Sequence, residues 1–170
     1  MNKHSKVFLP TLTVLLAAVL AACSSIDCPI DNIVACNYQL LKSNGSQDTL
    51  RQYRLSVLSA RRDTTQTDTV LINRDQNVKT FSLPMSFHGE EDLLFFVLSA
   101  DSSIYYVDTV RIRKTNVPHF ESVDCTPSYF HELRSVSTSH HAIDSIGIAN
   151  PSVGYDKTIT HLHIFFRHDI

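Results

Sequence analysis

The chain has 170 residues, 43% apolar and 19% charged, a composition that excludes an intrinsically disordered protein and indicates a single domain. Its 15 basic and 17 acidic residues give a formal charge of −2, whereas nucleic-acid binding generally needs a basic surplus, so no nucleic-acid partner is expected. With only four glycines, Gly-rich phosphate loops are not expected either, and no cofactor is predicted.

Residues 1–22 have the features of a bacterial lipoprotein signal peptide. Lys3 and Lys6 give a basic start, and residues 7–22 form an apolar stretch shorter than the roughly 20 residues of a membrane-spanning helix. This stretch ends in Leu20-Ala21-Ala22-Cys23, which resembles a lipobox, the motif that is cleaved before its cysteine and acylated on it. We therefore predict lipidation at Cys23. An ordinary secretory signal followed by a chance cysteine is the alternative.

Residues 23–31 are predicted to be a short tether between the lipid anchor and the domain. Loss of two signal-peptide lysines makes the mature chain more acidic, so the acyl chains on Cys23 must provide the membrane attachment. Ser24 follows the lipidated cysteine, and by resemblance to the enterobacterial sorting rule it favours the outer membrane, with the periplasmic or the surface side left open. The five steps from Cys23 to Cys28 span at most about 18 Å. A partner is therefore expected among membrane components.

Three further cysteines are predicted to divide into one disulfide and one buried thiol. Cys36 alternates with Val34, Tyr38 and Leu40 on one face of a strand pattern, which is typical of a buried position. Cys28 and Cys125 instead adjoin turn-forming residues, and we predict that these two form the disulfide. No Cys-x-x-Cys is present, so a thiol oxidoreductase or a zinc ribbon is not expected.

Residues 32–170 are predicted to form an all-β domain, because short alternating or apolar runs recur and no helical stripe persists. Asn, Asp and Ser clusters separate the runs, and Ser102-Ser103 marks the clearest hairpin. This pattern favours an antiparallel two-sheet sandwich of immunoglobulin-like type with about 8–10 strands. The expected strands are Ile33–Leu41, Tyr53–Ser59, Val70–Ile72, Lys79–Phe87, Leu93–Ala100, Ile104–Ile112, His119–Val123, Phe130–Val136, Ala142–Ile148 and Thr158–Phe166.

Two histidines near the C-terminus are candidate metal ligands. His161 and His163 share one face of a strand pattern, a spacing that some zinc sites use. The alternative places both on the solvent side, because Leu162, Ile164 and Phe166 form the opposite, apolar face. No third ligand is specified nearby.

The remaining polar motifs do not complete a catalytic pattern. His140-His141 with Asp144 is interpreted as a polar hairpin turn, and His131-Glu132 lacks the second histidine of a zincin motif. No Gly-x-Ser-x-Gly elbow is present, and the acidic run Glu90–Asp92 is typical of a solvated turn. We therefore expect the protein not to be an enzyme.

Aromatic pairs on two expected neighbouring strands suggest a glycan-binding surface. Phe95-Phe96 and Tyr105-Tyr106 each present one ring inward and one outward, so that two outward rings could stack on a sugar. Cross-strand aromatic pairs also stabilise sheets without any ligand, and the absence of Trp weakens the glycan hypothesis.

Short motifs in a fixed order resemble those of small Bacteroidetes lipoproteins that are classed as a domain of unknown function. The resemblance spans nearly the whole mature chain and matches Cys28 with Cys125, in agreement with the predicted pairing, while Thr126 replaces a usual glycine. It assigns no catalytic residue, and it implies an outer-membrane β-barrel protein as a partner. The motifs are Cys28-Pro29-Ile30-Asp31-Asn32, Leu71-Ile72-Asn73-Arg74, Leu83-Pro84, Pro118-His119-Phe120, Asp124-Cys125 and the segment from Ile143 to Pro151.

The same resemblance implies O-glycosylation at Asp-Ser/Thr-x tripeptides. Thr64 and Thr69, within and beside the polar loop 61–68, are the favoured sites, although Asp-Thr-Val is also common at strand starts. The other matches are Asp48-Thr49-Leu50, Asp108-Thr109-Val110 and Asp144-Ser145-Ile146.

These observations favour a lipid-anchored, non-enzymatic interaction module of the cell envelope whose molecular activity the sequence does not specify. A β-sandwich that binds a glycan or a metal ion is the alternative function.

Overall fold

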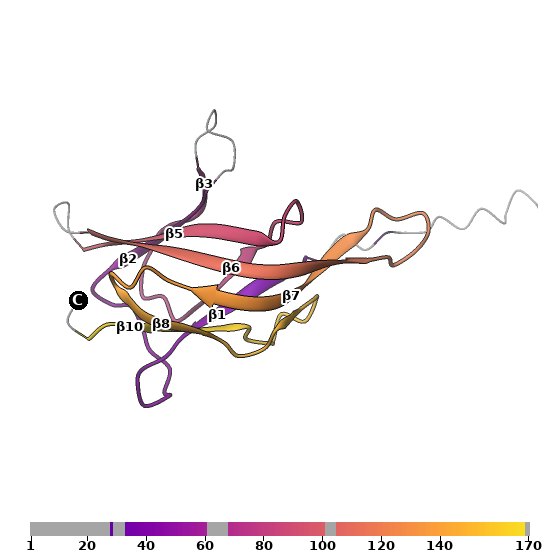
Figure 1. Ribbon diagram of the computed structural model, residues 1–170. Helices are drawn as coiled ribbons and strands as arrows, with labels where there is room; N and C mark the ends of the chain where they lie inside the picture. The colour runs from indigo at the N-terminus through magenta and orange to yellow at the C-terminus, as the bar shows by residue number, and fades with distance from the viewer. Residues whose placement is uncertain (1–27, 29–32, 61–67, 101–104, 169–170) are drawn as a thin grey trace, which may run out of the picture.

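The computed structural model describes residues 28, 33–60, 68–100 and 105–168, and within these ranges it contains ten strands and no helix (Figure 1). The all-β prediction is confirmed. No helix in these ranges is long and apolar enough to cross a membrane. The predicted signal peptide, lipidation at Cys23, the Ser102-Ser103 turn and Thr64 lie outside the described residues.

The ten strands form one four-stranded and one six-stranded sheet. The order is β4-β1-β10-β8 in the first sheet and β3-β2-β5-β6-β7-β9 in the second. The strands are β1 (Ala35–Leu40), β2 (Arg54–Ser59), β3 (Thr69–Asp75), β4 (Thr80–Pro84), β5 (Glu91–Ser99), β6 (Tyr105–His119), β7 (Ser128–Ser137), β8 (Ile143–Ile148), β9 (Ser152–Val153) and β10 (Leu162–Phe166).

Alternation of side chains explains the central strands. In β1, Cys36, Tyr38 and Leu40 are buried while their neighbours are only partly buried, as the pattern predicts. The same alternation buries Leu94, Phe96 and Leu98 in β5. Each sheet therefore presents one apolar face.

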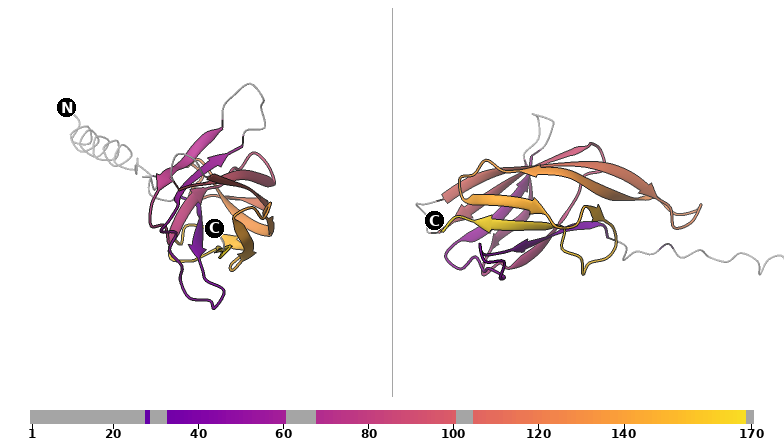
Figure 2. Two further views of the ribbon diagram at one scale, coloured as in Figure 1. Left: turned by 90° about the vertical axis from the view of Figure 1, so that its left-hand side faces the viewer. Right: turned by 60° about the horizontal axis from the view of Figure 1, so that its bottom comes forward.

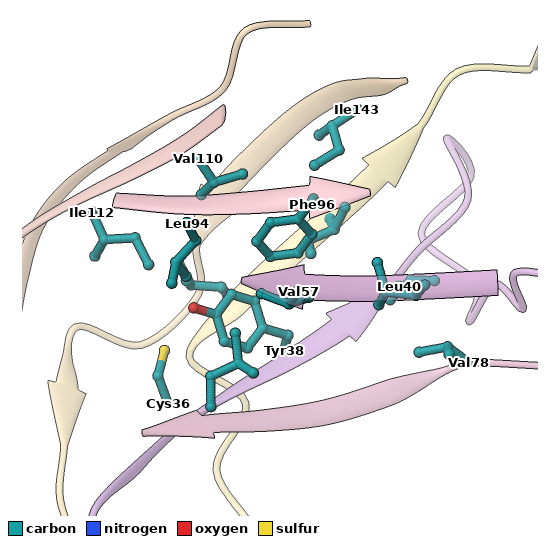
Figure 3. Packing of buried hydrophobic residues seen from close by; sticks show 14 of the residues in the cluster. Cys36, Tyr38, Leu40, Val57, Val78, Leu94, Phe96, Val110, Ile112 and Ile143 are labelled. Carbon is teal, nitrogen blue, oxygen red and sulfur yellow. The ribbon is translucent and has the colours of Figure 1, made fainter. Parts of the chain in front are cut away.

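Buried side chains of both sheets meet in one hydrophobic core (Figure 3). The ring of Tyr38 in β1 lies 6.2 Å from that of Phe96 in β5, and it stacks on Phe81 of β4 at 4.7 Å between ring centres. Because β1 and β5 belong to different sheets, the contact between Tyr38 and Phe96 joins the two sheets within the core.

The prediction that all strands pair in antiparallel fashion is wrong in one place. β1 pairs with β10 in parallel, with Tyr38 opposite Leu162 and Leu40 opposite Ile164. A parallel pair needs a long crossover connection, and here the whole chain between the first and the last strand supplies it. Alternation within each segment carries no signal for such a distant pairing.

The strand boundaries that differ most from prediction are the end of β6 and the start of β10. β6 continues through His119, past the expected end at Ile112, and the expected strand His119–Val123 is instead a turn-rich connection. Polar Lys114 and Asn116 interrupt the apolar pattern of β6, yet both continue its inward-facing alternation. The last strand begins at Leu162 rather than Thr158, because residues 154–161 form the connection from β9.

Candidate functional site

The most distinctive feature of the surface is a two-stranded arm formed by the distal halves of β6 and β7. The pairing of β5 with β6 ends at Glu91 and Arg113, whereas the pairing of β6 with β7 continues to His119 and Ser128. We call residues 114–133 the arm. A bulge at Arg113/Lys114 marks its base, and it extends past the end of the sheet (Figures 1 and 2).

Rings on two neighbouring loops brace the arm. His119 stacks on Phe130 across the arm at 4.3 Å between ring centres, and Tyr155 of the β9–β10 connection packs edge-on against Phe130 at 4.8 Å. Phe87 of the β4–β5 loop stacks on Tyr129 at 4.9 Å. These contacts hold the arm against the body of the domain.

The loop at the end of the arm carries the disulfide between Cys125 and Cys28, whose Cα atoms are 5.7 Å apart. Ser122 C=O accepts a hydrogen bond from Cys125 N–H at 3.2 Å, which closes a tight turn with Val123 at its second position. The pairing predicted from the sequence is therefore present, and it attaches the N-terminal part of the chain to the end of the arm.

Large apolar side chains are exposed around this disulfide. Val123 is 97% exposed, Phe120 63% and Val117 49%. We call these three residues the tip residues. Isolated exposed apolar residues are ordinary on protein surfaces, whereas these three lie within seven positions of one another near the end of the arm.

A buried ionic cluster lies at the base of the arm. The Lys114 ammonium, whose side chain is fully buried, contacts the Asp92 carboxylate at 2.9 Å and donates to Gly89 C=O at 3.1 Å. Asn116 Nδ2 donates to the same carbonyl at 2.9 Å. These bonds fix the β4–β5 loop against β6, so the cluster orders the base of the arm rather than facing a ligand.

His131 completes this cluster from β7. Its Nδ1 lies 2.8 Å from Asn116 Oδ1, and because Asn116 Nδ2 is used as a donor to carbonyls, the Nδ1 of His131 carries the proton of this bond. Burial, together with the positive charge of Lys114, lowers the pKa of His131 from 6.5 to about 4. The histidine is therefore neutral in the native protein near neutral pH.

Replacing His131 by glutamine is expected to remove part of the acid sensitivity of the protein. Because the folded pKa lies below the unfolded one, the unfolded chain binds more protons between pH 6.5 and 4, and the free energy of unfolding falls as pH falls through this window. The full effect is on the order of 3 kcal/mol. Urea unfolding from pH 7.5 to 4 measures it.

The matched control for this experiment is His168→Gln at an exposed position. The control should follow the wild-type dependence on pH, whereas His131→Gln should lose stability less steeply between pH 6.5 and 4. Parallel curves for all three proteins would contradict the assignment of His131 as a buried neutral histidine.

Asp108, which the sequence marks only as part of a glycosylation tripeptide, is the most heavily hydrogen-bonded buried carboxylate among the described residues. Its side chain accepts the backbone N–H groups of His141, Ala142 and Ile143, each at 2.7 Å, and the Ser139 hydroxyl at 2.9 Å. Burial raises the pKa of Asp108, but these bonds outweigh it and lower the pKa below its usual value of 3.8. Asp108 therefore fixes the β7–β8 connection onto β6.

This connection is not the hairpin turn that His140-His141 and Asp144 suggested. β7 lies in the six-stranded sheet and β8 in the four-stranded sheet, so the segment crosses from one sheet to the other. His140 adopts a left-handed backbone with φ of 61° and its Nδ1 bonds Asp144 C=O at 2.7 Å. Bonds to Asp108 hold the segment in this conformation.

The two candidate metal ligands, His161 and His163, differ in burial. His161 is fully buried, which contradicts the predicted solvent-facing position, and its Nδ1 accepts the N–H of Asn37 at 2.9 Å. The pKa of His161 is lowered, chiefly by burial. His163 is partly buried in β10. Across the described part of the chain, no three His, Cys, Asp or Glu residues gather to hold a metal ion.

Cys36 is a buried free thiol, as the alternation in β1 indicated. Burial raises its pKa to about 12, which the hydrogen bond with Tyr38 only partly offsets. The thiol is therefore protonated and unreactive in the folded protein.

The aromatic pairs do not form the stacking surface that was considered for a glycan. The register places Phe95 opposite Thr109 rather than opposite either tyrosine. Phe96 belongs to the core, and Tyr106 packs edge-on against Tyr53 at 6.0 Å between ring centres. Thr69, one of the two favoured glycosylation sites, is exposed at the start of β3.

A depression of about 510 Å³ beside β5 brings together the residue types of a hydrolytic triad. Ser86, His88 and Asp92 all line it. The hydrogen bonds that join these three residues involve the backbone, however: Ser86 N–H donates to the Asp92 carboxylate, and His88 N–H donates to the Ser86 hydroxyl. These bonds order the β4–β5 loop, and none joins the serine hydroxyl to the imidazole as nucleophile activation requires.

One family model matches the chain, over residues 54–166, and it describes a family of unknown function, DUF6452. The match includes the arm, Asp108 and Cys125, whereas Cys23 and Cys28 precede it. No curated protein and no solved structure matches the chain.

Proposed function

The chain belongs to the family of unknown function DUF6452, and we propose that it is a lipid-anchored cell-envelope protein that acts by binding a partner. In this proposal Cys23 carries the acyl chains, the protein is attached to the outer membrane, and the two packed sheets form an immunoglobulin-like sandwich. The domain presents the arm to other components of the membrane and performs no catalysis.

The observation that carries this proposal is the disulfide at the end of the arm. Cys28 lies five residues after Cys23 and is bonded to Cys125. The five steps from an acylated Cys23 to Cys28 span at most about 18 Å, so the disulfide would keep the end of the arm close to the bilayer surface. Several acyl chains make such attachment stable, whereas a single chain binds only marginally.

The expected partner is another membrane component, and an outer-membrane β-barrel protein is proposed. The braced arm supports this role, because a rigid projecting surface loses little conformational freedom when it binds. The buried polar groups at its base bond each other and the neighbouring loop, so they are not available to a partner.

Metabolic labelling with an alkyne analogue of palmitate tests the anchor. The full-length protein, expressed in bacteria, should incorporate the label and sediment with the membranes, and Cys23→Ser should lose both properties. Cys36→Ser, which changes a buried thiol, is the matched control and should keep the label. Incorporation that persists in Cys23→Ser, or a wild-type protein free of lipid by intact mass, would refute the proposed anchor.

Cross-linking in intact cells, followed by purification from native membranes, tests the partner. A membrane protein that cross-links through the arm and not through the opposite end of the domain is the expected result. Recovery of soluble proteins alone would contradict the proposed location of the partner.

A further inference from the structure

We propose that the tip residues Val117, Phe120 and Val123 enter the interface of the lipid bilayer as a second membrane contact beside the acyl chains. The proposal rests on the proposed anchor at Cys23. The anchor alone does not determine which surface of the domain meets the membrane. In this proposal the tip residues do, so the domain is oriented with the arm directed at the membrane.

The geometry of the turn places Val123 at its outermost point. Cys125 N–H bonds back to Ser122 C=O at 3.2 Å, and Asp124 N–H is 3.5 Å from the Ser122 hydroxyl. With the turn closed in this way and Val123 97% exposed, its side chain projects from the domain. Local hydrogen bonds of this kind also reduce the cost of bringing backbone into a less polar medium.

The covalent path from the anchor makes the bilayer the nearest apolar phase. Val123 is two residues from Cys125, which is bonded to Cys28, and Cys28 is five residues from the proposed acylated cysteine. A tether this short holds the tip at a high effective concentration next to the lipid, so even weak partitioning is sufficient for contact.

The charges near the tip are acidic, so an attraction between the tip and the membrane must come from its apolar side chains rather than from electrostatics. Glu121 lies 3.4 Å from the imidazole of His119, and Asp124 follows Val123 directly. An acidic tip gains nothing from anionic headgroups, so insertion into neutral lipid should be independent of salt. Each Val or Phe side chain that becomes buried should strengthen partitioning about tenfold.

The chain contains no tryptophan, so a single introduced tryptophan reports its own surroundings. The acylated full-length protein carrying Val123→Trp is reconstituted into phosphatidylcholine vesicles, with and without bromine on the upper acyl-chain carbons. The matched control is Val70→Trp, near the start of β3. The native side chain there is 54% exposed, and the strand lies away from the arm (Figure 1).

The expected result is a blue-shifted emission of the Val123→Trp protein that brominated lipid quenches strongly and that high salt leaves unchanged. Val70→Trp should keep the emission of a water-exposed indole. A Val123→Trp protein that floats with the vesicles but is quenched no more than Val70→Trp would overturn the membrane contact while leaving the anchor intact.

Two other outcomes are informative. If the protein lacks acyl chains by mass and does not float, the proposed anchor and the membrane contact both fail. If the tip remains unquenched in vesicles but a photo-crosslinker at position 123 captures a protein in native membranes, the tip binds protein and the lipid contact is refuted.

Discussion

Replacing Asp108 by asparagine is expected to lower the free energy of unfolding by about 3–4 kcal/mol, because the carboxylate is the common acceptor for three backbone N–H groups. An amide group places an N–H₂ donor where one carboxylate oxygen accepts, so at least one buried backbone N–H loses its partner. Urea or thermal unfolding of the purified protein measures the loss.

The same variant should change the response to acid. The pKa of Asp108 is lowered in the folded state, so the stability it provides is complete above the unfolded pKa and disappears as pH falls through the folded pKa. Asp108→Asn should lack this acid-dependent part below about pH 4. Asp144→Asn, an exposed carboxylate on β8, is the matched control and should change stability by less than about 0.5 kcal/mol. Equal stabilities of the two variants would contradict the role assigned to Asp108.

Removal of the Cys28–Cys125 disulfide should also lower the free energy of unfolding by a large amount. The bond closes a sequence separation of 97 residues, and in the chain-entropy model such a crosslink contributes about 4–5 kcal/mol by restricting the unfolded chain. The double replacement Cys28→Ser with Cys125→Ser, measured by urea unfolding, should show a shift of the midpoint to lower urea.

Single replacements provide the control for this prediction. Cys28→Ser and Cys125→Ser each break the same bond, so each should lose about as much stability as the double variant rather than half of it. Reduction of the wild-type protein should give a similar loss. Additive effects of the two single variants would show that the cysteines act separately.

The residues that alternate cleanly were predictable from the sequence. Cys36, Tyr38 and Leu40 are buried in β1 as expected, and the two cysteines beside turns are the pair that is joined. These features are local, or they follow from the small number of cysteines available, so the sequence carries a direct signal for them.

The features that escaped prediction depend on distant partners. Lys114 follows Val110 and Ile112 on the inward face of β6, yet a lysine at such a position is read as the end of a strand unless Asp92 is known to face it. His161 was expected in solvent because Leu162 and Ile164 mark the opposite face as apolar. The backbone N–H of Asn37 that bonds the His161 ring comes from a residue 124 positions away. For the burial of Lys114, the sequence offered one signal: its position continues the alternation of the inward-facing residues Val110 and Ile112.

The parallel pairing of β1 with β10 has a consequence for how the molecule assembles. Asn37 C=O accepts the N–H of His161, and Leu41 N–H donates to Ile164 C=O, so the interior of the four-stranded sheet joins the two ends of the domain. Contacts of such high sequence separation form slowly, because the loop must close before they stabilise anything. The four-stranded sheet therefore cannot be completed until β10 has been synthesised, whereas all strands of the six-stranded sheet precede β10 in the chain.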